Sequence, residues 1–334
     1  MPLDLTKTLV VGISSTALFN LSAEDQAFRD AEAQDKNAAI AAYRKQMRAA
    51  EHLPLEPGPG MPVVEALLRL NEHTLAGEPP IVEVVVMSRN SPETGLRLLN
   101  TIRSRHLPIT RSVFTGGEPV APLLKAFSVD LFLTTSAKDA QSAIDERACA
   151  AATLTGKQAK PAADGRVRIA FDGDAVIFDD ESELIYKTQD LEAFHANETA
   201  HENDPLGPGP YAALLRKLSS MQERLPMRIE YSPVRISIVT ARNAPSDLRV
   251  IKTLRSWGVY VDEAYFLGGL PKAPVLEAIN PHIFFDDQDV HLRDSAEVVP
   301  SGKVPYRSDS MLVGLQAKST AASPAEDVRP PDAV

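Results

Sequence analysis

Two aspartates in the C-terminal half of the chain stand where they could act on a phosphate. Asp172 and Asp174 directly follow the apolar run Val167–Phe171, and Gly173 between them permits a tight turn. In such a pair, one carboxylate can attack phosphorus and form an aspartyl phosphate, while the other carries the proton of the leaving oxygen. An Asp-x-Asp motif alone is a weak signal, because the chain contains a second one at Asp287–Asp289.

The other residues that this chemistry needs lie further along the chain. Carboxylates that face a phosphate repel it unless a cation intervenes, and Mg²⁺ prefers oxygen ligands. The predicted metal ligands are Asp172, Asp174, Asp286 and Asp287. Lys272 and the hydroxyl of Thr240 are expected to bind the remaining phosphate oxygens and to stabilise charge in the transition state. The predicted catalytic residues are therefore Asp172, Asp174, Thr240 and Lys272.

Alternating strands and helices must bring these residues together. The sequence predicts strands at Val167–Phe171, Ile236–Val239, Ala264–Leu267 and Ile283–Phe285. Between them it predicts a helix with Ser246 as N-cap that stops at Gly258, a turn at Gly268-Gly269, and a helix over Val275–Ile279. This alternation predicts an α/β fold with a parallel sheet, in which ligands bind beyond the carboxyl ends of the strands.

The chain also repeats itself. The segments Leu96–Thr135 and Leu248–Asp287 align without gaps, and roughly a third of the aligned positions are identical, several times what chance gives. Shorter matches precede them: SRNSP with ARNAP, PGP with PGP, and GISSTALFN with FDGDAVIFD. The economical interpretation is two halves that derive from one ancestral unit.

The repeat separates catalytic positions from scaffold positions. The first half lacks each catalytic residue at the matching position. Ile13 and Ser15 stand at the places of Asp172 and Asp174, Met87 at that of Thr240, Val120 at that of Lys272, and Thr134 and Thr135 at those of Asp286 and Asp287. We therefore predict a non-catalytic half over residues 1–155 and a catalytic half over residues 166–315, with a linker at Thr155–Gly165. A small helical cap is expected at about residues 179–233, and the tail over residues 316–334 is expected to be disordered.

Composition limits the remaining possibilities. The 334 residues carry a formal net charge of -10, which argues against a non-specific nucleic-acid binder. No apolar run approaches the ~18 residues needed to span a bilayer, so no membrane association is expected. The single cysteine, Cys149, excludes an intrachain disulfide and favours a soluble protein of the cytoplasm.

The ordered set FDGDAV, IVTAR, GGLPK and FFDDQ resembles the four motifs of the haloacid dehalogenase superfamily. The longer match, which includes SRNSPETGLR, LGPGP, VTARNAP and LRSWGV, resembles the cytosolic 5′-nucleotidases of type I. The resemblance implies a Rossmann-like sheet, Mg²⁺ and nucleoside 5′-monophosphates such as AMP. It also implies Asp172 as nucleophile, Asp174 as acid/base, and Asp286 as metal ligand with Asp287 beside it.

Several alternatives stay open at this point. The same motifs would serve a phosphatase of sugar phosphates or of another small phosphomonoester, and a catalytically inactive nucleotide-binding regulator belongs to a different class. Arg242 is a candidate phosphate clamp, although Arg89 at the same place in the first half equally favours a structural role. The first half could bind a regulatory nucleotide, complete the active site or form a homo-oligomer interface.

Overall fold

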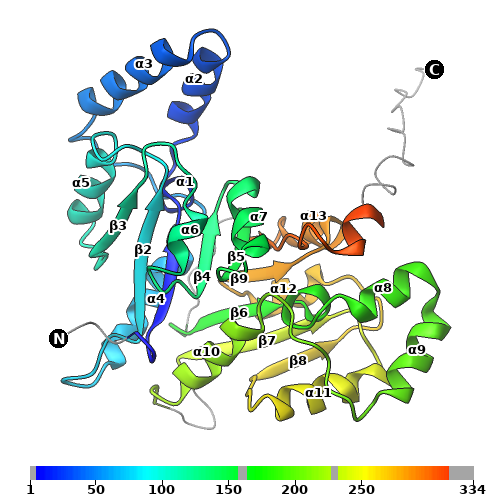
Figure 1. Cartoon of the computed structure of the whole chain (residues 1–334). Helices are drawn as coiled ribbons and strands as arrows, with labels where there is room; N and C mark the ends of the chain where they lie inside the picture. Colours follow the sequence, from blue (N-terminus) through cyan, green and yellow to red (C-terminus); the bar gives the residue numbers. More distant parts are fainter. Residues whose placement is uncertain (1–4, 157–163, 227–231, 316–334) are drawn as a thin grey trace, which may run out of the picture.

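The computed structural model describes residues 5–156, 164–226 and 232–315 of the chain (Figure 1). The predicted tail over residues 316–334 lies outside the described residues, as does most of the predicted linker at 155–165. Within the described ranges the chain folds as an α/β protein around one mostly parallel sheet, which confirms the predicted Rossmann-like class at this level.

Ten strands form this sheet, in the order β3-β2-β1-β4-β5-β10-β9-β6-β7-β8. The strands of the first half are β1 (Leu9–Ile13), β2 (Val82–Ser88), β3 (Arg111–Phe114), β4 (Leu131–Thr134) and β5 (Ala150–Thr155). Those of the second half are β6 (Val167–Phe171), β7 (Val234–Thr240), β8 (Glu263–Phe266), β9 (Ile283–Asp286) and β10 (Ser301–Lys303). All neighbouring strands are parallel except β5 and β10, which join the two half-sheets in antiparallel fashion.

The two half-sheets have the same strand order around their first strands, β1 and β6. A short antiparallel bridge also recurs after each of these strands, between Phe19 and Pro57 and between Phe178 and Pro208. The glycine after each bridging proline is required by close packing. A Cβ atom at Gly209 would lie 2.1 Å from the carbonyl oxygen of Phe178, and one at Gly58 would lie 2.6 Å from that of Ala17.

Helices cover the faces of the sheet (Figure 1). The first half contains α1 (Ser15–Leu18), α2 (Ser22–Glu32), α3 (Lys36–Ala49), α4 (Met61–Arg69), a 3₁₀ turn (Leu70–His73), α5 (Leu96–Ser104), α6 (Ala121–Leu124) and α7 (Ala137–Asp145). The second half contains α8 (Glu181–Thr188), α9 (Leu191–Ala200), α10 (Ala212–Gln222), α11 (Ser246–Ser256), α12 (Ala273–Ile279) and α13 (Asp289–Ser295). A π-helical turn, Gly173–Ile177, follows β6 directly.

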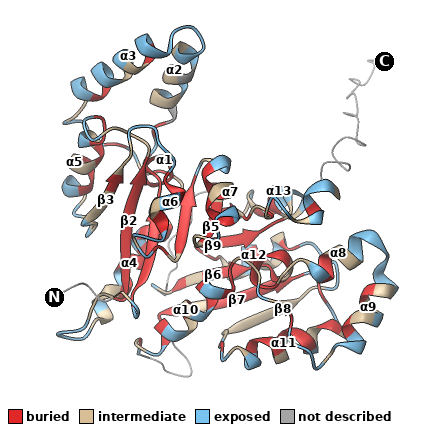
Figure 2. Cartoon of the chain, in the orientation of Figure 1, coloured by how far each residue is buried: buried red, intermediate tan, exposed pale blue. Residues whose placement is uncertain are grey.

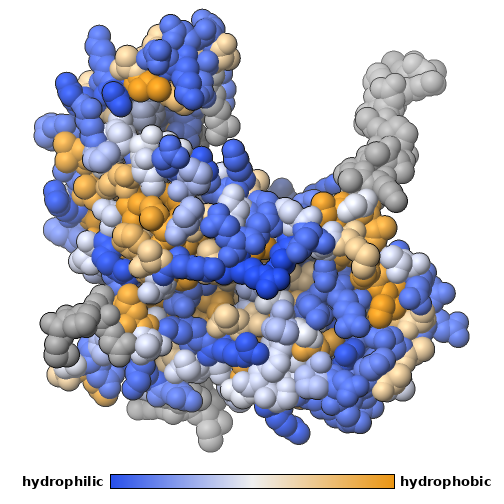
Figure 3. All heavy atoms as spheres, in the orientation of Figure 1, coloured by the Kyte–Doolittle hydropathy of each residue, from blue (hydrophilic) through white to orange (hydrophobic). Residues whose placement is uncertain are grey.

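The hydrophobic core lies along the sheet (Figure 2). Strands β1, β2 and β4 are buried along their whole length, as are most residues of β6 and β7, because helices cover both of their faces. Strands of this kind read in the sequence as short continuous apolar runs, which is why Val167–Phe171 could be located to the residue. On the face drawn in Figure 3 hydrophilic residues predominate, in keeping with the net charge of the chain.

The segment expected to form the cap divides into two parts. Helices α8 and α9 pack on each other at the far end of the second half-sheet, in the place that α2 and α3 take in the first half (Figure 1). Helix α10 behaves differently: Leu214, Leu215 and Leu218 are buried in the main core, and the helix contacts β1 and the π-helical turn. It therefore joins the two halves rather than standing out from them.

The predicted ends of α11 are right at one terminus and wrong at the other. The helix stops before Gly258, whose positive φ of 67° continues no helix. Ser246, expected as the N-cap, is instead the first helical residue and donates its hydroxyl to the carbonyl of Asn243 at 2.7 Å. The preceding Pro245 takes the N-cap position without a side-chain hydrogen bond. In the described ranges, no helix combines the length and apolar character that crossing a bilayer requires.

Candidate active site

The carboxyl ends of three neighbouring strands meet at one edge of the second half-sheet. Strand β6 lies between β7 and β9, and all three are parallel. Asp172 follows β6, Thr240 ends β7 and Asp286 ends β9. The backbone N–H of Asp172 donates to the carbonyl of Phe285 at 2.8 Å, which continues the ladder by one residue and sets Asp172 beside Asp286.

Three of the predicted metal ligands form a buried carboxylate cluster. Asp172, Asp286 and Asp287 are 4%, 0% and 1% exposed. One oxygen of each lies within 4.8 Å of the others, which is close enough for a single cation to touch all three. Backbone N–H groups hold two of them: Gly173 donates to Asp172 and Gln288 to Asp286, both at 2.7 Å.

Lys272 enters this cluster from the loop before α12. Its ammonium lies 2.8 Å from Oδ2 of Asp172 and 2.7 Å from Oδ2 of Asp286, and the side chain is only 1% exposed. The positive φ values of Gly268 and Gly269 produce the predicted turn that leads from β8 into this loop. Burial alone would lower the pKa of Lys272, but the carboxylates of Asp172 and Asp286 raise it above its usual value, so the residue stays charged.

The charges of the cluster do not balance. Burial raises the pKa of Asp172 to about 7; Lys272 opposes this rise, whereas the charge of Asp286 adds to it. Burial likewise raises the pKa of Asp287 well above its usual value, and the charges of Asp286 and Asp172 reinforce the effect. Three buried carboxylates around one ammonium therefore leave a negative excess that a further cation would relieve.

The donor set suits a divalent cation. The Tyr306 hydroxyl donates to Oδ2 of Asp287, whereas Oδ1 of the same carboxylate is buried and has no hydrogen-bond partner within the described ranges. A buried, unpaired carboxylate oxygen is costly unless something binds it. An all-oxygen set with a free acceptor is what Mg²⁺ prefers, and the residues present therefore fit such an ion.

Asp174 lies outside the carboxylate cluster. The π-helical turn departs from helical geometry at Asp174 and at Ala175, whose φ is +59°. The turn directs the Asp174 carboxylate toward Arg242, which donates from Nε at 2.8 Å and from Nη2 at 2.6 Å. Its role as a metal ligand stays a prediction, because the three carboxylates that converge here do not include it.

Thr240 lies beside the turn that carries the two aspartates. A Cβ atom at Gly173 would be 3.3 Å from Oγ1 of Thr240, so the glycine keeps the hydroxyl close to the backbone that follows Asp172. The hydroxyl accepts a 3.3 Å hydrogen bond from the N–H of Arg242 and can still donate. Its predicted role at a phosphate oxygen is compatible with this position.

Within the described residues, the carboxyl ends of the strands of the first half carry no carboxylate cluster like that of Asp172, Asp286 and Asp287. Ile13 and Val120 are buried apolar residues at the positions of Asp172 and Lys272. Thr134 and Thr135 stand at the positions of the paired aspartates, and Thr135 hydrogen bonds to Thr16 at 2.6 Å. At these four positions the first half keeps the backbone frame with neutral side chains.

The structure places three further residues at the site, of which only Arg242 is a candidate from the sequence. The sequence makes Arg242 a candidate phosphate clamp, but its guanidinium binds the carboxylates of Asp174 and Glu198. Tyr306 follows the three-residue strand β10, which is too short for a periodic signal, and Glu198 lies in the last turn of α9. Neither has a sequence pattern that would have pointed to the site, because each reaches it only through the tertiary fold.

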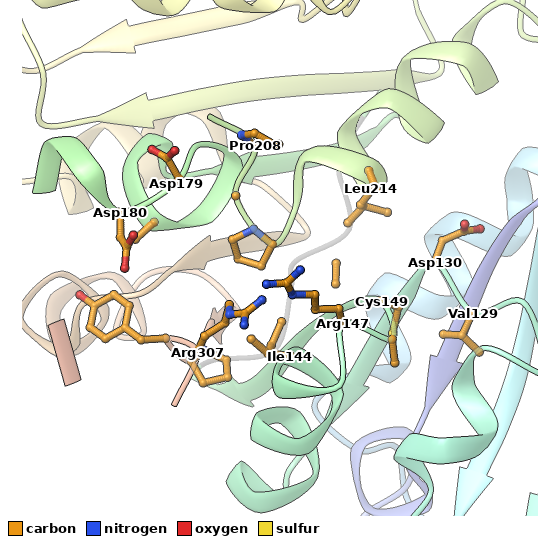
Figure 4. Close-up of a pocket in the computed structure, with 18 residues that line it drawn as sticks. Val129, Asp130, Ile144, Arg147, Cys149, Asp179, Asp180, Pro208, Leu214 and Arg307 are labelled. Carbon is orange, nitrogen blue, oxygen red and sulfur yellow. The ribbon is translucent and has the colours of Figure 1, made fainter. Parts of the chain in front are cut away.

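A cavity of about 520 Å³ lies between the two halves (Figure 4). The first half contributes residues just before β4 and β5, among them Asp130 and Cys149. The second half contributes Asp179 and Tyr306. Two arginines, Arg147 and Arg307, point into the cavity in Figure 4. Because Tyr306 also hydrogen bonds to Asp287, the wall of this cavity touches the carboxylate cluster.

Comparison with known proteins agrees with the resemblance to 5′-nucleotidases that the sequence motifs show. Residues 1–311 match the 5′-nucleotidase family. Over 290 residues the chain is 36% identical to the human protein named "Cytosolic 5′-nucleotidase 1B", an alignment that covers 85% of this chain and 46% of the relative. The chain thus spans less than half the length of that relative. No solved structure matches the chain significantly.

The balance of charge predicts how the fold responds to loss of Lys272. Lys272→Met should lower the free energy of unfolding by about 3–5 kcal/mol in EDTA, because it leaves two buried carboxylates uncompensated. Mg²⁺ should restore part of this loss by supplying positive charge, as measured by denaturant unfolding with and without the ion. The control is Lys303→Met, which breaks a surface pair with Asp289 and should cost less than about 1 kcal/mol without a response to Mg²⁺. A Lys272→Met variant as stable as the wild type in EDTA would contradict this account.

Proposed function

The chain belongs to the 5′-nucleotidase family, and from this premise we propose that it hydrolyses nucleoside 5′-monophosphates, AMP-like substrates, to nucleoside and phosphate. The observation that carries the proposal is the buried carboxylate cluster, with Lys272 between Asp172 and Asp286 at the carboxyl ends of parallel strands. The human relative is named as a cytosolic 5′-nucleotidase, which supports the same activity and a cytoplasmic location for this chain.

In the first step, Asp172 acts as the nucleophile. An oxygen of its carboxylate forms a bond to phosphorus while the bond from phosphorus to the 5′-oxygen breaks. The electron pair of that bond goes to the 5′-oxygen, which takes a proton from Asp174 as the nucleoside leaves. Lys272 and the Thr240 hydroxyl hold the other phosphate oxygens during this transfer.

In the second step, water regenerates the enzyme. The water oxygen bonds to phosphorus, its proton passes to Asp174, and the bond between phosphorus and the Asp172 oxygen breaks. Phosphate is released, and Asp172 returns to its carboxylate form. When bound, Mg²⁺ would neutralise the phosphate charge; Asp172, Asp286 and Asp287 would hold it. Asp174 remains a fourth proposed ligand.

We also propose that the sheet is of the haloacid dehalogenase type and that the halves are copies of one ancestral unit. The shared strand order and the repeated bridge after β1 and β6 support this origin. In this proposal residues 1–155 form the non-catalytic half and residues 166–315 the catalytic half. Helices α8 and α9 are its cap, since α10 packs into the core.

Replacing the nucleophile tests the mechanism directly. Asp172→Asn should lower the rate of phosphate release by at least about 10³-fold, because the amide cannot form the aspartyl phosphate. The fold should persist, and in EDTA the variant should be at least as stable as the wild type, because a buried charge is removed. The matched control is Asp289→Asn in the second Asp-x-Asp motif, where the side chain is 70% exposed; its rate should stay near normal. A near-normal rate for Asp172→Asn would remove Asp172 from the mechanism.

Metal and substrate are tested together in one phosphate-release assay. Chelation should stop hydrolysis and added Mg²⁺ should restore it, because the charge excess of the cluster repels the substrate phosphate. Nucleoside monophosphates should react faster than sugar phosphates. Faster release from sugar phosphates would favour the alternative phosphatase, and nucleotide binding without any release would favour an inactive regulator. Hydrolysis that persists in EDTA would contradict the role given to Asp286.

The cavity between the halves supports a second candidate function, the binding of a regulatory nucleotide. Arg147 and Arg307 could bind its phosphate, although Arg307 also pairs with Asp309 at 2.6 Å. We expect calorimetry on Asp172→Asn to find two nucleotides per chain and Arg147→Ala to remove one of them. A stoichiometry of one in both variants would count against this site.

A further inference from the structure

A buried network of charges connects Asp174 to the α8–α9 cap. The guanidinium of Arg242 binds both oxygens of Asp174 and, through Nη1, Oε2 of Glu198 at 2.5 Å. The side chains of Arg242 and Glu198 are 2% and 0% exposed. Arg249 completes the network with a contact of 2.9 Å from Nη1 to Oε1 of Glu198. Two carboxylates and two guanidiniums therefore balance within it.

Glu198 belongs to the cap and is held there on several sides. It lies in α9, and its Oε1 also accepts the hydroxyl of Ser182 in α8 at 2.9 Å. The ring of Phe194, one turn earlier in α9, lies 5.3 Å from the Arg242 guanidinium. Helix α9 thus contacts Arg242 directly and α8 contacts Glu198, so a shift of the cap would change the surroundings of Arg242.

Comparison of the two halves shows which contacts of this network occur in both halves and which occur only in the second. Arg249 aligns with Arg97, and each of the two arginines binds a glutamate and a backbone carbonyl. Arg97 binds Glu24 in α2 at 2.8 Å and the carbonyl of Leu53 at 3.0 Å. Arg249 binds Glu198 in α9 and the carbonyl of Asp204 at 2.9 Å. This pair of contacts fastens the inserted helices in both halves and therefore belongs to the scaffold.

Arg242, in contrast, makes different contacts from those of its aligned residue in the first half. It aligns with Arg89, which binds Asp139 of α7 and no residue of the turn after β1. Ser15, at the position of Asp174, hydrogen bonds to Ser88 instead. The link from an inserted helix through an arginine to the second residue after the strand occurs only in the second half, within the described residues. It accompanies the predicted catalytic residues rather than the frame.

We propose that Arg242 and Glu198 are positioning residues that aim Asp174 for proton transfer to the leaving oxygen, an inference that rests on the proposed phosphatase activity. A guanidinium fork fixes the plane of a carboxylate, which a single ammonium cannot do. Glu198 fixes the fork in turn, so the position of the cap determines the orientation of Asp174. Arg242 takes up one lone pair on each oxygen of Asp174, and proton transfer uses the second lone pair of one of these oxygens.

Leaving groups of different basicity report on this positioning. The 5′-oxygen of a nucleoside is strongly basic and needs a proton as it leaves, whereas p-nitrophenolate is stable without one. A positioned general acid contributes about 10²–10⁴-fold to the rate when the proton is needed. A variant that only misdirects Asp174 should therefore lose activity toward AMP and keep most of it toward p-nitrophenyl phosphate.

The experiment compares kcat/KM for AMP and for p-nitrophenyl phosphate, which both report on the steps up to phosphoryl transfer. Arg242→Lys keeps the buried charge without the fork, and Glu198→Gln keeps the shape without the charge. For each we expect a loss of about 10²-fold with AMP and of less than about threefold with p-nitrophenyl phosphate. The controls in the first half are Arg89→Lys, at the position aligned with Arg242, and Glu24→Gln, which removes the charge that Arg97 binds; both should leave the ratio of the two values unchanged.

The possible failures of the experiment differ from one another. Equal losses with both substrates would overturn the positioning role and leave the phosphatase activity standing. Wild-type values of kcat/KM with both substrates in Arg242→Lys, with thermal unfolding that shows an intact fold, would also overturn it. If Glu198→Gln does not fold, Arg242→Lys alone decides the matter, because it keeps the buried charge. Absence of activity in the wild type toward both substrates would instead reject the proposed function.

Discussion

The ion pairs of Lys272 with Asp172 and Asp286 are the interaction on which the rest of the site depends. Burial of a carboxylate costs several kcal/mol unless opposite charge lies close by, and here three carboxylates share one ammonium. Such a cluster forms only where the backbone holds the carboxylates close together and leaves them no way to move apart. The strand register supplies this constraint, because β6 and β9 are paired up to the residues that carry the charges.

The first half indicates that the frame does not need these charges. Its strands have the same order, and its neutral side chains stand where the second half has Asp172, Lys272 and the paired aspartates. The apolar strands and the close backbone contacts at Gly58 and Gly209 are common to both halves and can account for the fold. The charged residues, for which we propose a catalytic role, therefore lower the stability of the second half, and its hydrophobic core has to offset this loss.

The sequence predicted those parts that local pattern determines. The strands β6 and β9 and the turn at Gly268 were found because buried parallel strands are short apolar runs and positive φ favours glycine. The N-cap of α11 was misplaced by one residue, since a proline can begin the turn as well as a serine can. The direction of Asp174, the part played by Glu198 and the core position of α10 depend on contacts between distant segments, and local pattern carries no information about them.

The antiparallel junction of β5 with β10 has a consequence for the role of the first half. It turns the two half-sheets in opposite directions, so the carboxyl ends of the second half lie on the same side as the amino ends of the first. Residues before β4 and β5 consequently face the segment after β10, which includes Tyr306 and its contact with Asp287. The first half, for which we propose no catalytic residues, thereby forms one wall of the space beside the carboxylate cluster, and this position gives it a structural part in the site.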